Sequence, residues 1–288
     1  MKTITKLINL GHGKANDAPF LRNNVGKFHA IVLSGGGIDS FMSTCAYLLT
    51  AHYAGPPTFK GKSFKGYKLT FLIINYGQQG YRAESSMTKA QAAFFTNLGV
   101  EVSIVEIDDP LMQHIRNPLK DRAAQKQNAT GDYAKNDDYV PNRNARFVFA
   151  AAGLAETIDA RTIVIGAVGN VNQDNSLAFL ESAHNTIKNS NRDVFPNLYA
   201  PFVLMSKSAV ALYAKEIDVV DELRNLSTSC FDSIELVSGP ETPPLPYVKQ
   251  CGECRSCSSL KQAFKFACVE DPYIYKGVPR TAVFGFGK

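Results

Sequence analysis

Two short stretches of the chain carry residues whose types and spacing could do chemistry, and the first is SGGGIDS at 34–40. Its three glycines lack a Cβ, so they can take positive φ and turn several backbone N–H groups toward one point. A helix that begins near Asp39 would add its positive end there, which favours an anion. Ser40 can donate its hydroxyl to a phosphate oxygen, and Asp39 can cap the helix or hold a metal ion. The stretch, which is neither Walker A nor G-x-G-x-x-G, predicts a nucleotide-phosphate cradle, with a plain tight turn as the alternative.

The second stretch is CGECRSC at 251–257, which presents three thiols from one turn, with Gly252 giving the backbone room to fold around an ion. A fourth cysteine, Cys230, precedes it in the segment STSCFDS. Four thiolates with no vacant position are typical of a closed, tetrahedral structural zinc site, and free thiols are the alternative. The pattern predicts metal ligation by Cys230, Cys251, Cys254 and Cys257. The remaining cysteines, Cys45 and Cys268, are expected in the core.

The composition is that of an ordinary globular protein, with 288 residues, 45% of them hydrophobic, and a formal net charge of +5. Lys and Arg are scattered without a basic tract, which indicates a solvated surface better than an anion pocket or a nucleic-acid face. No apolar run is long enough to span a bilayer, and the N-terminus lacks the apolar core of a signal peptide. We therefore expect a cytoplasmic protein without membrane association, where a reducing environment favours metal-bound cysteines over disulfides.

The elements that must position these residues alternate along the chain. We predict strands at 28–34, 67–77, 100–108 and 161–169, and helices at 39–53, 83–99, 206–217 and from about 140 and 176 onward. Short apolar strands separated by helices predict an α/β fold with a doubly wound, mostly parallel sheet. Ligands of such sheets lie beyond the carboxyl ends of the strands, and residues 34–40 directly follow the first strand.

The glycine stretch resembles the pyrophosphate loop, Ser-Gly-Gly-x-Asp-Ser, of the ATP pyrophosphatases, or PP-loop proteins. These enzymes split ATP into AMP and pyrophosphate in order to adenylate a carbonyl or carboxylate oxygen. Five further segments resemble, in the same order, motifs of one subfamily, the 7-cyano-7-deazaguanine synthases (QueC): NYGQ at 75–78, VPNRN at 140–144, MSKSAV at 205–210, TSCF at 228–231 and CGECRSC. The resemblance covers roughly residues 28–268.

The resemblance implies that ATP binds with Mg²⁺ at Ser34, Gly35, Gly36, Gly37, Asp39, Ser40, Asn75, Tyr76 and Lys207. It implies a pocket for a deazaguanine carboxylate at Gln78, Arg143, Asn144, Asn170 and Asp174, and it assigns catalysis to Asp39, Ser40, Lys207 and Arg143. Lys207 would supply charge to the phosphates, and the Arg143 fork would hold a phosphate or carboxylate. A solvated lysine at a helix start and a helix-capping ion pair are the respective alternatives.

The resemblance also favours Zn²⁺ at the four cysteines over an iron–sulfur cluster, which some tRNA-thiolating relatives of the PP-loop proteins carry. It divides the chain into an N-terminal extension at 1–27, an ATP-binding α/β domain at 28–220 and a zinc-binding segment at 221–288. Homo-oligomers are common in the family, so we expect a homodimer.

Three departures from the family pattern bear on the substrate. The leading serine of the loop motif falls on Gly35, which leaves Ser34 one position early. In the family segment Asp-Cys-Arg-Pro-Glu-Phe, the arginine position is Ser176 here and the glutamate position is Ala178. The family's Gln-Arg-His run becomes Gln78-Gln79-Gly80. Losing such groups alters what a pocket binds, because buried polar groups pair specifically.

These features predict an ATP-dependent C–N ligase that forms AMP and pyrophosphate. It would adenylate a carboxylate such as 7-carboxy-7-deazaguanine, and ammonia would then give the amide and, after a second activation, the nitrile. One alternative is a paralogue that passes the acyl group to another amine, on a protein or nucleic acid, as in anti-phage systems. Two others are a nucleotide-binding protein without turnover and a tRNA-thiolating enzyme, which would need a reactive cysteine.

Overall fold

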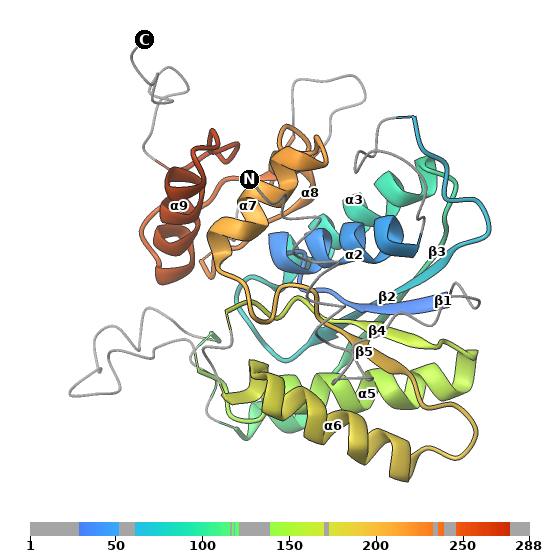
Figure 1. The fold of residues 1–288 in the computed structure, drawn as a ribbon. Coiled ribbons are helices and arrows are strands. Elements are labelled where there is room, and N and C mark those ends of the chain that lie inside the picture. Colours follow the sequence, from blue (N-terminus) through green and yellow to red (C-terminus); the bar gives the residue numbers. More distant parts are fainter. Residues whose placement is uncertain are drawn as a thin grey trace.

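A five-stranded parallel sheet forms the centre of the molecule (Figure 1). The computed structural model describes residues 29–51, 61–115, 117, 119–120, 139–169, 173–232, 236–238 and 246–276. The strands are β1 (His29–Leu33), β2 (Lys68–Asn75), β3 (Glu101–Asp108), β4 (Thr162–Val164) and β5 (Asn197–Tyr199). Their order is β3-β2-β1-β4-β5, and every neighbouring pair is parallel. The predicted doubly wound parallel sheet is therefore confirmed, with β1 in its middle.

Helices cover both faces of this sheet, and Figure 1 shows α2, α3, α7 and α8 on one side and α5 and α6 on the other. Their bounds are α2 (Ile38–Ala51), α3 (Tyr81–Asn97), α5 (Arg143–Ile158), α6 (Leu177–Ser190), α7 (Lys207–Glu216), α8 (Leu223–Leu226) and α9 (Arg255–Ala267). Two 3-10 turns, η3 (Pro110–Gln113) and η5 (Gln173–Asn175), and an antiparallel hairpin of β6 (Leu236–Ser238) and β7 (Pro246–Val248) complete the described elements. Helix α9 packs against α7, is capped by Cys254 at its start and contains Cys257, the last cysteine of the cluster.

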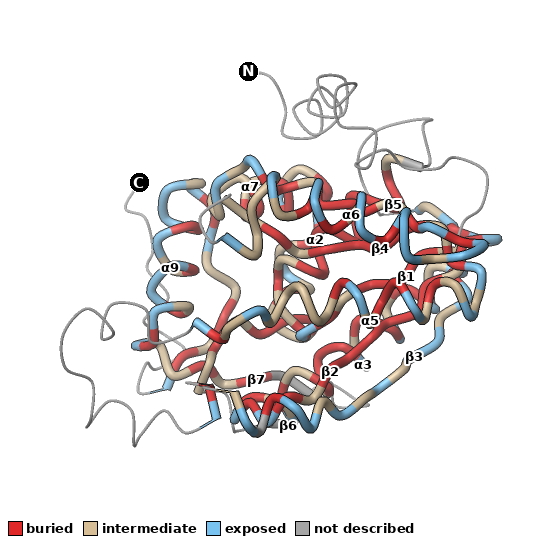
Figure 2. Tube along the Cα trace, turned by 90° about the horizontal axis from the view of Figure 1, so that it is seen from below, coloured by how far each residue is buried: buried red, intermediate tan, exposed pale blue. Residues whose placement is uncertain are grey.

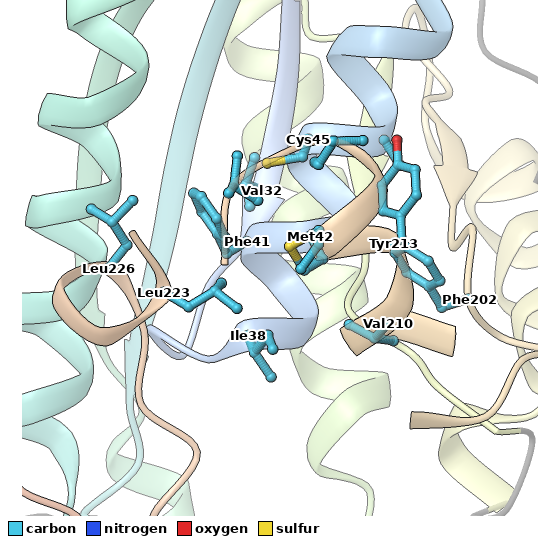
Figure 3. Packing of buried hydrophobic residues seen from close by; sticks show 14 of the residues in the cluster. Val32, Ile38, Phe41, Met42, Cys45, Phe202, Val210, Tyr213, Leu223 and Leu226 are labelled. Carbon is cyan, nitrogen blue, oxygen red and sulfur yellow. The ribbon is translucent and has the colours of Figure 1, made fainter. Parts of the chain in front are cut away.

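The larger part of the core lies between the sheet and the α2 side. Figure 3 shows Ile38, Phe41, Met42 and Cys45 of α2 packed with Val32 of β1 and with Val210, Tyr213 and Leu223 from later elements. All of these side chains are at most 1% exposed. The first helix is thus fixed from several sides, which fixes the glycine loop that leads into it. The opposite face packs a second cluster, from Ile31, Val148 and Leu180 among others, under α5 and α6.

Burial differs sharply between the central and the edge strands (Figure 2). The middle of β2 is buried without interruption, whereas every residue of β3 is exposed or half-buried. A parallel strand that is covered on both faces is largely apolar, which explains the sequence LTFLII in β2, where Thr70 is the one polar residue.

Of the two cysteines expected in the core, the prediction is confirmed for Cys45 and wrong for Cys268. Cys45 is fully buried in α2. Cys268 is exposed, because it ends α9 in the left-handed conformation, at φ 52°, and lies outside the apolar stripe of that helix.

Candidate functional site

A cavity of about 360 Å³ opens at the carboxyl ends of β1, β2 and β4. Most of the residues predicted for the site line it together: Ser34, Gly35, Gly37, Asp39, Ser40, Tyr76, Gln78, Arg143, Asn144, Asp174 and Lys207. They come from five separate parts of the sequence, and the parallel topology brings them to one edge of the sheet, where α/β folds hold their ligands. Asn170 lies outside the described residues.

Asn75 is placed differently from the residues around it, since it is not part of the cavity lining. Its side-chain amide donates to Asp108 Oδ1 at 2.7 Å, and its Oδ1 accepts from the backbone N–H of Gly77 at 3.1 Å. The Asn75 side chain therefore ties β2 to β3 and shapes the turn that presents Tyr76.

The glycine loop requires a glycine at Gly36, because α3 approaches the loop closely there. Gly36 has φ +62°, and a Cβ at this position would lie 2.4 Å from the carbonyl oxygen of Glu84. No side chain fits at that distance, so Gly36 allows the first turn of α3 to pack directly on the loop. At the end of β4, a Cβ on Gly166 would lie 2.7 Å from the backbone nitrogen of Ser40. Two glycines thus hold the loop between α3 and β4.

Replacing Gly36 by alanine is expected to destabilise the protein more than the same change at Gly66. Both glycines have positive φ, where a Cβ costs roughly 1–3 kcal/mol, but only Gly36 meets backbone atoms, while Gly66 faces open space. Chemical denaturation of the two variants measures the difference. Equal losses of unfolding free energy would show that the loop can move away from α3, and that the close approach is not required.

The Ser34 side chain stabilises the loop and does not donate its hydroxyl hydrogen into the cavity. Its Oγ accepts from the backbone N–H of Gly36 at 3.2 Å and lies 2.8 Å from Thr88 Oγ1. Because Thr88 gives its own hydrogen to the carbonyl of Glu84 at 3.0 Å, the hydrogen between the two hydroxyls belongs to Ser34. Gly35 stands where the leading serine of the motif falls, so the loop offers backbone N–H groups there and no hydroxyl.

Lys207 and Asp39 lie at the starts of two different helices, and their side chains face each other. Lys207 is the first residue of α7, and its ammonium group forms a hydrogen-bonded ion pair with Asp39 Oδ2 in the first turn of α2. The other carboxylate oxygen, Asp39 Oδ1, is buried without a hydrogen-bond partner among the described residues. An orphaned carboxylate oxygen beside a phosphate-binding loop fits a Mg²⁺ ligand, since this ion takes one or two carboxylates together with phosphate oxygens.

Arg143 lies at the start of α5 as a half-buried cation. Its Nη1 donates to the Tyr76 hydroxyl at 3.4 Å, and its guanidinium lies 5.9 Å from the centre of the Tyr76 ring. No described carboxylate forms an ion pair with it. Burial opposes its charge, but Tyr76, Asp174 and Glu84 together outweigh burial and raise the pKa of the guanidinium. A half-buried guanidinium without an ion-pair partner among the described residues is suited to receive an anionic ligand group.

Gln78 is held in place by its own chain. Its Oε1 accepts from the backbone N–H of Tyr76 at 2.9 Å, and its Nε2 donates to Glu84 Oε2 at 2.7 Å and to the carbonyl of Ile74 at 3.3 Å. Its amide is thus engaged before any ligand binds. The sequence did not predict Glu84 as a site residue, because an acidic residue inside a helix is usually exposed to solvent. In the structure it lines the cavity, and burial raises the pKa of its carboxyl against the opposing effects of Gln78 and Arg143.

A polar cluster closes the side of the cavity formed by α5 and α6. Asn144 donates its side-chain amide to Asn175 Oδ1 at 3.0 Å and its backbone N–H to Asp174 Oδ2 at 3.4 Å. Ser176, at the arginine position of the family motif, caps α6 by accepting from the N–H of Phe179 at 3.1 Å. In this chain the position therefore serves as a helix cap.

The four cysteines meet as the sequence predicted, with all four Sγ atoms within 4.8 Å of one another. Cys251 Sγ and Cys257 Sγ are 3.9 Å apart. Sulfurs bound to one tetrahedral ion at a metal–sulfur distance of about 2.3 Å would be about 3.8 Å apart, so the cluster fits a single ion. A cubane cluster would hold its thiolates further apart, because iron atoms lie between them. Cys254 also caps α9, since its Sγ accepts from the N–H of Cys257.

The segment that carries Cys230 also touches the glycine loop. The backbone N–H of Thr228 donates to the carbonyl of Gly36 at 2.8 Å, and a Cβ on Gly37 would lie 3.5 Å from the carbonyl of Thr228. Ser229, Cys230 and Phe231 line the cavity as well. The cysteine cluster therefore anchors one wall of the site, which the sequence alone did not reveal.

Among the described residues, no helix has the length and the apolar character needed to cross a membrane.

Comparison with known proteins identifies the family to which the chain is similar. The family model of "Queuosine biosynthesis protein QueC" matches residues 29–268. A 7-cyano-7-deazaguanine synthase of Methanobrevibacter smithii is 27% identical over 261 residues, which cover 85% of this chain and 97% of that protein. The synthase of Oceanobacillus iheyensis is 29% identical over 252 residues, with coverages of 85% and 97%. A solved U34-tRNA thiolase, NcsA of Methanococcus maripaludis, matches 75% of this chain and 65% of its own with 15% identity and a TM-score of 0.39.

Proposed function

Because the chain belongs to the QueC family, we propose that it is an ATP-dependent C–N ligase that adenylates a deazaguanine carboxylate and transfers the acyl group to an amine. The observation that carries this proposal is one cavity that holds two separate anion receptors. The glycine loop with Lys207 is suited to phosphates, and Arg143 is suited to a second anion. An enzyme that joins ATP to a carboxylate needs both receptors.

In the first step, the glycine loop and the start of α2 would bind the β- and γ-phosphates of ATP through backbone N–H groups. Lys207 would leave Asp39 and follow the charge that accumulates on departing pyrophosphate. Mg²⁺, when bound at Asp39, would neutralise phosphate charge. Arg143 would hold the carboxylate of the substrate by a two-pronged hydrogen bond and aim it at the α-phosphorus.

In the second step, an amine attacks the acyl-adenylate and AMP leaves. Ammonia gives an amide, and a second activation of the amide oxygen gives the nitrile. The heterocycle would lie toward Asn144 and Asp174, whose amide and carboxylate groups can pair with a guanine-like edge. Because Ser176 and Ala178 replace the arginine and glutamate of the family motif, a different amine acceptor remains part of the proposal.

We further propose that the four cysteines hold Zn²⁺ as a structural ion, since four thiolates around one tetrahedral centre leave no open position for catalysis. A tRNA-thiolating activity has less support. Burial raises the pKa of the Cys45 thiol well above its ordinary value, so Cys45 is not a nucleophile. The only other cysteine outside the cluster, Cys268, is not part of the cavity lining.

The purified protein is expected to release AMP and pyrophosphate from ATP only when 7-carboxy-7-deazaguanine is present. With ammonia, product masses should show the amide or the nitrile, whereas AMP without either product would indicate another amine acceptor. The control is guanine, which lacks the carboxylate and should release no AMP. ATP binding without AMP release under every condition would overturn the ligase proposal in favour of a nucleotide-binding protein. Sedimentation of the same sample tests the expected homodimer.

A further inference from the structure

The four sulfurs of the cysteine cluster do not receive the same hydrogen bonds. Cys230 Sγ accepts from the backbone N–H of Cys251 at 3.3 Å, and Cys254 Sγ accepts from that of Cys257 at 3.5 Å. Cys251 Sγ accepts from two backbone N–H groups, those of Glu253 at 3.5 Å and Cys254 at 3.3 Å. Among the described residues, no backbone N–H donates to Cys257 Sγ. One sulfur therefore lacks the kind of donor that the other three have.

The side chain that faces Cys257 belongs to Gln250, the residue directly before the CGECRSC turn. Its Oε1 lies 3.6 Å from Cys257 Sγ. Gln250 is 0% exposed, and its Nε2 is buried without a hydrogen-bond partner among the described residues. A buried N–H group without a partner is rare and costly. An unpaired donor and a sulfur without a backbone donor thus lie next to each other.

The backbone of Gln250 is held on both sides, so its side chain approaches the cluster from a fixed point. Its N–H donates to the carbonyl of Ile274 at 2.9 Å, and its carbonyl accepts from the N–H of Lys276 at 2.8 Å. The last torsion of a glutamine side chain is, in contrast, broad and roughly two-fold. A half-turn about this bond exchanges Oε1 and Nε2 and leaves the rest of the residue in place.

We propose that Gln250 is a hydrogen-bond donor to the metal site: when the four cysteines bind an ion, its Nε2 takes the place of Oε1 and donates to Cys257 Sγ. A thiol can donate its hydrogen to Oε1, whereas a thiolate bound to a metal has no hydrogen and can only accept. Its charge would then face the negative end of the amide dipole. The half-turn removes this repulsion and gives the unpaired N–H group an acceptor. This inference rests on the proposed metal site and not on the ligase activity.

The half-turn moves Oε1 to the position of Nε2, where no described group donates to it. This cost is the smaller one, because buried carbonyl oxygens lack a partner more often than buried N–H groups do. The hydrogen bond that is gained is also of the stronger kind, since its acceptor carries a charge. With an ion bound, the balance favours Nε2 toward the sulfur.

A donor to Cys257 bears on how tightly the ion is held. Four thiolates around one divalent ion carry a net negative charge, and Cys254 and Cys257 are at most 4% exposed. Buried charge is costly unless hydrogen bonds or an opposite charge compensate it. Lys261 donates to the carbonyl of Gly252 at 2.9 Å rather than to a sulfur. An N–H group of Gln250 adds to the compensation, and groups that hydrogen-bond to metal ligands typically change metal affinity by about 10–100-fold.

The hydrogen bond itself can be tested in the unaltered, full-length protein after a magnetic cadmium isotope has replaced its ion. A nuclear spin coupling between the bound cadmium and the side-chain amide protons of one glutamine is expected, because an N–H···S–Cd bond transmits it. Gln250→Glu, which has nearly the same size and no N–H, should remove this signal and keep the couplings to backbone N–H groups. A set of couplings that contains no glutamine amide proton would overturn the proposal.

Metal affinity measures the effect of the bond. Gln250→Glu and Gln250→Leu both remove the donor, and the second adds no charge. The matched control is Gln91→Leu, since Gln91 is also 0% exposed and donates to the carbonyl of Leu226 at 2.7 Å rather than to a sulfur. In competition with a chromophoric chelator, zinc binding is expected to weaken by about tenfold or more in both Gln250 variants and by less than about twofold in the control.

Cobalt substitution separates a lost hydrogen bond from a loss of packing. The sulfur-to-cobalt charge-transfer band should move to longer wavelength in both Gln250 variants, because a thiolate without its donor gives up electrons more readily, and should stay in place in Gln91→Leu. Equal weakening of zinc binding in the control, or a band that does not move, would mean that Gln250 only fills space. A protein that binds neither zinc nor cobalt would overturn the metal site and this inference with it. Because no measurement uses ATP, failure of the ligase proposal would be seen separately.

Discussion

Replacing Lys207 by alanine is expected to lower the rate of AMP release by about 100-fold or more, because the variant loses the only described lysine that reaches the glycine loop. The Lys207 ammonium group is paired with Asp39, and under the proposed function it would turn to the departing pyrophosphate once ATP has bound. Its removal leaves that charge unbalanced where it develops. It also leaves the Asp39 carboxylate without its cation, so Mg²⁺ at this position becomes more important for binding. Rapid-quench measurement of AMP, together with ATP binding by calorimetry, separates the two effects.

Lys215→Ala is the control for this variant, since Lys215 lies in the last turn of the same helix and is exposed. It should leave AMP release unchanged within about twofold. Lys207→Arg should restore only part of the rate, because a planar guanidinium is not equivalent to an ammonium at a crowded phosphate. If Lys207→Ala kept the rate within threefold of the unaltered protein, the lysine would be a surface residue that pairs with Asp39 and does no chemistry.

Loss of the metal ion is expected to unfold the C-terminal part of the molecule and with it to abolish activity. Apparent binding free energies of structural zinc, on the order of 10–16 kcal/mol, equal or exceed the total stability of a typical domain. The cluster does not stand apart from the core, since Cys254, Cys257, Leu260 and Phe264 are buried in the same hydrophobic cluster as α2. A large fall in melting temperature after chelation, with loss of helical signal, is therefore expected.

Cys254→Ser isolates the role of the thiolate. Serine is a good helix cap, so the variant keeps the start of α9 and loses only the metal ligand. Cys268→Ser, at the other end of the same helix and exposed, is the matched control. Elemental analysis should find zinc in the unaltered protein and in the control but not in Cys254→Ser. Equal melting temperatures for the three proteins would mean that the cysteines hold no structural ion. A visible absorption band of iron would show that the cysteines hold an iron–sulfur cluster and not zinc.

Local patterns were sufficient to predict the order of the main elements. The largely apolar run of β2 and the glycines after β1 are each encoded within about ten residues. The three-residue strand β5 was missed because so short a run carries no periodicity, and α9 was missed because its cysteines read as metal ligands rather than as helix. Its position against α7 depends on tertiary contacts that no local window contains.

The same limit applies to the site. Asp39, Arg143 and Lys207 were predicted from their own motifs, and the structure gathers them in one cavity. Glu84 and Gly166 were missed, because their importance arises only when α3 and β4 approach the glycine loop. Sequence spacing gives no measure of such approaches between distant segments.

The hydrogen bond from Thr228 to Gly36 makes the glycine loop depend on a segment that is synthesised late. A ribosome makes β1, α2 and the rest of the parallel sheet well before it reaches the segment that braces the glycine loop. Until that segment has emerged and gathered its thiols around an ion, the nascent chain has a sheet but an unbraced phosphate cradle. Under the proposed function, a molecule that is unfinished or lacks the proposed ion would have an unbraced glycine loop and would be unable to use ATP.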